Sequence, residues 1–168
     1  MEIDWDRIQN ALSRRFLRQH LQQRRILADF FRLLPEEEYG YRLVDRPDRR
    51  ADSPRESLAH ILRVQAVYMR GARTGSLEFE GDDLTPGLGT SKEELLGAME
   101  RLAGELYAML CDPAFDPNAP IQAPWGQESA LSTLYLIRDH DILHVGWNLA
   151  LMDHLDTERF PSLREYWG

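Results

Sequence analysis

Two of the five histidines in this sequence stand four residues apart, at a spacing that suits metal binding. If the segment around them is helical, His140 and His144 project from the same face, because side chains at i and i+4 share a face of an α-helix. Two imidazoles on adjacent turns can converge on one divalent ion at about 2.0–2.1 Å, the usual zinc–nitrogen distance. The pair therefore predicts half of a transition-metal site.

His60 is the expected third ligand. It is in line with Val64 and Val67 at helical spacing and borders an apolar arc, so we expect it to face inward or toward a cleft. Three protein ligands with open positions left for water or substrate are typical of a catalytic or ligand-exchanging metal centre. The alternative is that each imidazole lies at the edge of the core and is satisfied by a backbone carbonyl.

Two further residues are candidates for the surroundings of this site. His20 falls near the margin of an apolar stripe, where it is either a pocket or fourth-ligand residue or a residue at the edge of the core. Asp141 adjoins His140 and is a candidate to orient a ligand imidazole through a hydrogen bond, although solvated charge is the commoner role. The segment from His140 to His144 also resembles the HExxH motif of zinc peptidases with aspartate in place of glutamate, which leaves a peptidase as an alternative.

Four helical stretches must position these side chains. Apolar spacing and helix-stop signals predict helices over 4–34, 54–71, 91–111 and 128–155. Capping-box patterns, Ser-x-x-Glu, mark the starts of the second and third helices at Ser53 and Ser91. Strand patterns are weak: residues 77–80 alternate but are too few for a sheet. The sequence predicts an all-α four-helix bundle.

The connections between these helices are expected to be irregular. Residues 42–52 are predicted to form an exposed connection, and the aromatic tail 160–168 is predicted to pack back on the bundle. Two long loops, 70–90 and 112–125, are expected to supply the walls of a substrate pocket. Trp125 and Trp147 are candidate lining residues, with packing in the core or an interface as the alternative for both.

Size and composition fit one small acidic domain over residues 1–168. Hydrophobic residues make up 43% of the chain and charged residues 29%, and the net charge is −8. This charge argues against nucleic acid and anionic membranes as partners. The longest apolar run, 106–111, is far too short to cross a bilayer. With one cysteine and no visible secretory signal, the expected location is the cytoplasm.

The order and spacing of several short motifs resemble the DinB/YfiT-like superfamily of helical metal-binding proteins over nearly the whole chain. The runs that carry the resemblance are Arg25-Ile26-Leu27 and Leu34-Pro35-Glu36-Glu37, Ser57-Leu58-Ala59-His60-Ile61, His140-xxx-His144-Val145-Gly146, and Phe160-Pro161-Ser162-Leu163 with Tyr166-Trp167-Gly168. No single run is highly specific, and their combination carries the assignment.

The resemblance implies a four-helix bundle of up-down-down-up topology and a homodimer. It also implies a metal site formed by His60, His140 and His144, with zinc or nickel as the usual ion. Characterised members are thiol-dependent S-transferases or isomerases that use bacillithiol, mycothiol or glutathione. This chain has Gln65 and Trp147 where relatives often have glutamate and glutamine, which makes both residues candidates for shaping the pocket.

Two hypotheses therefore compete with the peptidase alternative. The first is a metal-dependent enzyme of the S-transferase, isomerase or related hydrolase type, acting on a small molecule together with a low-molecular-weight thiol. The second is a non-catalytic helical protein that binds a metal or ligand and acts through dimerisation.

Overall fold

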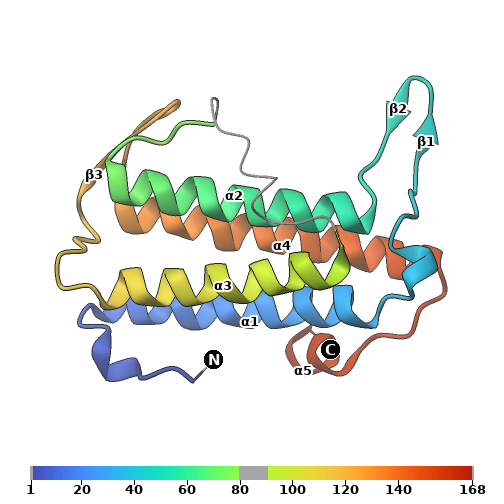
Figure 1. Cartoon of the computed structure of the whole chain (residues 1–168), viewed down its shortest axis with the longest axis horizontal. Helices are drawn as coiled ribbons and strands as arrows, with labels where there is room; N and C mark the ends of the chain where they lie inside the picture. The colour runs from blue at the N-terminus through green and yellow to red at the C-terminus, as the bar shows by residue number, and fades with distance from the viewer. Residues whose placement is uncertain (1, 80–90, 168) are drawn as a thin grey trace.

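Four long helices form the body of the protein in a computed structural model that describes residues 2–79 and 91–167. They are α1 (Ala11–Leu33), α2 (Pro54–Thr74), α3 (Lys92–Cys111) and α4 (Ala130–His154). Helices α1 and α4 run in one direction and α2 and α3 in the other (Figure 1). The prediction of an all-α bundle with up-down-down-up topology is confirmed.

The helices begin where the sequence signals place them. Ser53 and Ser91 each accept a hydrogen bond from the backbone N–H three residues later, and Glu56 and Glu94 close both capping boxes. Helix α2 continues three residues past its predicted end at Gly71 and stops at Gly75, whose φ of 84° suits glycine.

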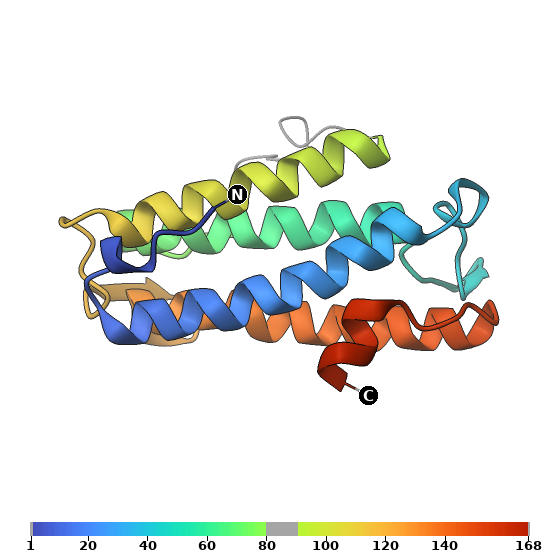
Figure 2. The same cartoon turned by 90° about the horizontal axis from the view of Figure 1, so that it is seen from below.

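Helix α4 packs against both α1 and α2, and α3 packs against the same two helices (Figure 2). Buried leucine, isoleucine, phenylalanine and methionine side chains fill the space between them. None of the helices in the described ranges is long and apolar enough to cross a membrane. Because α2 packs against α4, side chains from these two helices face one another across their interface.

The start of the chain differs from the predicted helix over 4–34. A short 3-10 helix, η1 (Trp5–Arg7), comes first, and α1 begins only at Ala11. The interruption follows from Asn10, whose side chain accepts a hydrogen bond from the backbone N–H of Ser13 and so caps a new helix.

The connections contain short strands that the sequence analysis did not predict. Strands β1 (Asp45–Arg46) and β2 (Arg49–Arg50) form one antiparallel pair within the predicted exposed connection. Strands β3 (Pro120–Ala123) and β4 (Gly126–Ser129) form another within and just after the predicted 112–125 loop, and α4 therefore starts at Ala130. A further 3-10 helix, η2 (Glu36–Glu38), follows α1.

The last described segment folds back on the bundle. Residues of the aromatic tail form helix α5 (Pro161–Trp167), which packs against α1 (Figure 2). Phe160 and Leu163 are buried there, so the tail contributes apolar side chains to the core. The sequence analysis predicted that this tail packs on the bundle, but it did not predict that the tail is helical.

Candidate metal centre

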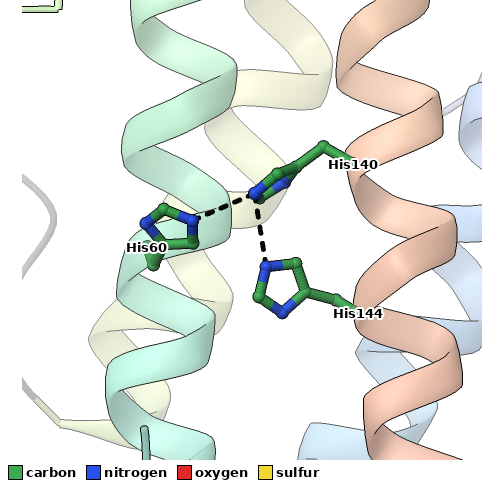
Figure 3. Close-up of side chains that lie close together, drawn as sticks. All are labelled: His60, His140 and His144. Carbon is green, nitrogen blue, oxygen red and sulfur yellow. Dashed lines mark hydrogen bonds between the residues drawn. The ribbon is translucent and has the colours of Figure 1, made fainter.

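Three histidines from two facing helices point toward one another between α2 and α4 (Figure 3). His60 extends from α2 and His140 and His144 from α4. The Nε2 atom of His140 lies 3.0 Å from the Nε2 atom of His60 and 3.3 Å from that of His144. Each residue offers one ring nitrogen within 4.8 Å of the other two. The structure thus brings together the three ligands that the sequence analysis proposed.

These separations suit a single bound ion. Two nitrogens that bind one metal at 2.0–2.1 Å, with angles near those of tetrahedral or octahedral coordination, lie roughly 2.9–3.4 Å apart. The two Nε2 separations at His140 fall in this range. Three imidazole donors suit zinc, nickel, iron and copper, so the donor set fits a transition metal without naming one.

A serine on α2 orients one of the three imidazoles. Ser57 is one turn before His60, and its Oγ lies 2.9 Å from Nδ1 of His144. When Oγ accepts the Nδ1 proton, the lone pair of His144 stays on Nε2, which faces the other two rings. The sequence analysis missed Ser57. Its position three residues before His60, and therefore on the same face of the helix, was the available signal.

The electrostatics of the cluster keep the imidazoles neutral. Burial, together with the neighbouring His144 and His60, lowers the pKa of His140 to about 4. Burial and the neighbouring His60 lower the pKa of His144 to about 4 as well, and burial lowers the pKa of His60. Neutral imidazole is the form that binds a metal, so the cluster is in its ligating state at neutral pH.

A cleft of about 320 Å³ opens beside His144. One wall is the segment from Arg49 to Asp52, at the end of the β1–β2 hairpin, and the other is α4 with Leu143 and Trp147. The structure places Trp147 next to a candidate ligand. The expected wall from 112–125 is replaced by the 49–52 segment, because the β1–β2 hairpin leads directly into the end of α2 that carries Ser57 and His60.

Trp125 lies elsewhere. It is in the turn between β3 and β4, at the end of the bundle where α2 stops (Figure 1). It is exposed, and its ring lies 6.2 Å from that of Phe79, which in turn contacts Tyr68. Residues 80–90 of the other expected wall lie outside the described residues.

Gln65 is also away from the cluster. It is fully buried on the side of α2 that faces α3, where its Nε2 donates to the backbone oxygen of Leu102 at 3.2 Å and to Met69 Sδ at 3.4 Å. Gln65 is five positions after His60, a spacing that turns the two side chains to different faces of the helix. Gln65 therefore packs between helices and does not line the cleft.

His20 and Asp141 form a second buried polar group, between α1 and α4. The Asp141 carboxylate accepts a hydrogen bond from Arg24 at 2.8 Å, and its Oδ2 lies 3.3 Å from His20 Nδ1. Burial alone would raise the pKa of Asp141, but Arg24 and His20 hold it below its usual range. Burial lowers the pKa of His20, which keeps that ring neutral.

This pairing argues against the peptidase alternative. A zinc peptidase needs the acidic residue of its motif to reach a water molecule at the metal. Here the Asp141 side chain is fully buried against Arg24 and His20 on α1. Asp141 and His20 therefore belong to the packing of α1 on α4, and His20 is not placed as a fourth ligand.

The fold and the cluster define a helical-bundle protein with a candidate metal centre between two of its helices. A family model, that of the DinB superfamily, matches residues 19–147. The chain therefore belongs to the DinB superfamily, and the resemblance seen in the sequence is confirmed. The matched residues include Ser57 and all three histidines of the cluster.

The same fold is seen among solved structures. The chain is similar to YjoA, a DinB-like protein from Bacillus subtilis, with a TM-score of 0.64 and 15% sequence identity over 88% of this chain and 95% of that one. At this identity the likeness concerns the fold alone. No curated protein matches the chain.

Proposed function

We propose that this protein binds a divalent ion, zinc or nickel, through His60, His140 and His144, and that it is a metal-dependent enzyme of the thiol-dependent S-transferase or isomerase type. The observation that carries the proposal is the convergence of three imidazole nitrogens at separations that suit one ion. Membership of the DinB superfamily supports it. The proposed substrate is a small molecule, with a low-molecular-weight thiol as co-substrate.

The chain's own residues have distinct roles in this proposal. The three imidazoles hold the ion, and Ser57 keeps the lone pair of His144 directed at it. Bound there, a divalent ion would lower the pKa of a thiol and so supply a nucleophilic thiolate at neutral pH. Trp147 and the 49–52 segment form a cleft beside His144 that a substrate can enter. Among the residues that the structure describes, the other side of α4 is buried in the core, so it offers no second entrance.

The first test is metal content. Untagged wild-type protein should contain, or take up, close to one equivalent of zinc or nickel by plasma mass spectrometry, and His60→Ala should lose it. His154→Ala is the matched control, because His154 is on the same α4 helix as two of the ligands but bonds to Tyr41 at 2.7 Å and lies outside the cluster. It should keep the metal.

The second test is turnover. Metal-loaded protein should transfer bacillithiol, mycothiol or glutathione to an electrophile such as 1-chloro-2,4-dinitrobenzene, and His60→Ala should not. Wild-type protein that refuses both zinc and nickel would overturn the metal site. Full metal occupancy without turnover for any thiol would overturn the enzyme and favour a binding protein.

A further inference from the structure

The cleft beside His144 carries an excess of positive charge on its hairpin wall. Arg49 and Arg50 both line it, and both are exposed. The guanidinium of Arg50 lies 3.6 Å from Glu56, a carboxylate that Arg42 already binds. Within the described ranges, Arg49 has no ion-pair partner. Arg49 is thus the cation in this wall that is available to a ligand.

The histidine cluster adds to this preference for negative charge. Three neutral imidazoles bring no negative charge to a divalent ion, in contrast to sites with carboxylate or thiolate ligands. The acid that lines the cleft is Asp52. A ligand in the cleft therefore meets a net positive charge from Arg49 and Arg50 on one side and, with an ion bound, from the metal centre on the other, while the Asp52 carboxylate opposes it.

The opposite wall is suited to an apolar group. Trp147 is partly buried beside His144, and Leu143 next to it is 73% exposed. A tryptophan face and an exposed leucine favour contact with the carbon part of a ligand. The cleft thus offers an apolar wall and a cationic wall within reach of the same histidine.

We infer that the substrate or thiol bound in this cleft carries an anionic oxygen group, a carboxylate or a phosphate, that pairs with Arg49 and, more weakly, with Arg50. The planar guanidinium presents parallel N–H donors that match both kinds of anion. The apolar part of the same molecule lies against Trp147. The inference rests on the proposed function, because it specifies the molecule that enters the proposed metal centre.

The test compares thiols that differ in one charged group. Zinc-loaded protein is titrated calorimetrically with 3-mercaptopropionate and 2-mercaptoethanol, and with 4′-phosphopantetheine and pantetheine. We expect the anionic member of at least one pair to bind about tenfold more tightly, and the preference to shrink as salt screens the charges. The pair that shows it distinguishes carboxylate from phosphate.

Three variants test whether the tighter binding of the anionic thiol depends on the charged residues of the cleft. Arg49→Gln should weaken binding of the anionic thiol by about fivefold and leave the neutral thiol unchanged, and Asp52→Asn should tighten it. Arg15→Gln is the control of equal charge change, since Arg15 is exposed near the start of α1, at the other end of the bundle from the β1–β2 hairpin (Figure 2). It should have no effect.

The outcomes separate the inference from the function on which it rests. Equal affinity for both members of each pair, or equal losses in Arg49→Gln and Arg15→Gln, overturns the inference and leaves the metal-dependent function standing. Failure of every thiol to bind zinc-loaded protein overturns both.

Discussion

Replacing Ser57 with alanine tests how the candidate metal centre is held in place. The Ser57 Oγ lies 2.9 Å from Nδ1 of His144, and the serine is only 1% exposed. In Ser57→Ala the Nδ1 proton loses its acceptor, and the ring is free to turn or to move its proton to Nε2, the atom that would bind the ion.

The expected magnitude follows from comparable metal sites. Removing the hydrogen-bond partner of a ligand histidine typically lowers metal affinity by about 10- to 100-fold. This corresponds to about 1.4–2.7 kcal/mol of binding free energy. The metal-free protein loses one hydrogen bond to a partly buried ring, which costs about 1 kcal/mol of unfolding free energy. The larger effect should thus be on metal binding.

Competition with a chromophoric chelator measures zinc affinity, and urea unfolding measures stability. Ser13→Ala is the matched control, because Ser13 is another helical serine with 1% exposure, and its Oγ has no hydrogen-bond partner in the part of the chain that the structure describes. Zinc affinity within twofold of wild type in Ser57→Ala would refute the orienting role. So would an equal loss in Ser13→Ala.

Two further predictions concern stability. His140 and His144 have pKa values lowered to about 4, so the unfolded chain binds protons more readily than the fold as pH drops. Metal-free protein should therefore lose about 2–4 kcal/mol of unfolding free energy between pH 6.5 and pH 4, as measured by urea unfolding; a flat profile would contradict the assigned burial. Asp141→Asn should cost about 3–5 kcal/mol, because Arg24 keeps a buried charge without its counter-ion. Asp153→Asn, which breaks an exposed ion pair, should cost less than about 1 kcal/mol in the same assay.

The parts of the fold that local patterns determine were predictable from the sequence. The capping boxes at Ser53 and Ser91 place the starts of α2 and α3, because a helix start depends on residues within one turn. The i, i+4 spacing puts His140 and His144 on one face for the same reason. The addition of His60 needed more than spacing, since it depends on α2 packing beside α4.

The cleft wall could not be predicted in the same way. Strands β1 and β2 are only two residues each, too short for an alternating pattern to appear in the sequence. The place of the hairpin beside His144 follows from the path of the chain between α1 and α2, not from its own residues. The large aromatic Trp125 therefore pointed to a connection away from the histidine cluster. The charged 49–52 segment is exposed, as predicted, but its position beside His144 was not predicted.

The roles of His140 and Asp141 show why neighbouring residues on α4 could not be assigned from the pattern alone. Helix α4 is covered by α2 on one side and by α1 on another, so polar residues can be buried on either. His140 faces α2 and joins the cluster, while Asp141, one residue and about 100° further round the helix, faces α1 and binds Arg24. The ion pair fixes the rotation of α4 against α1. That same rotation directs His140 and His144 toward His60, so the buried ion pair supports the candidate metal centre without touching it.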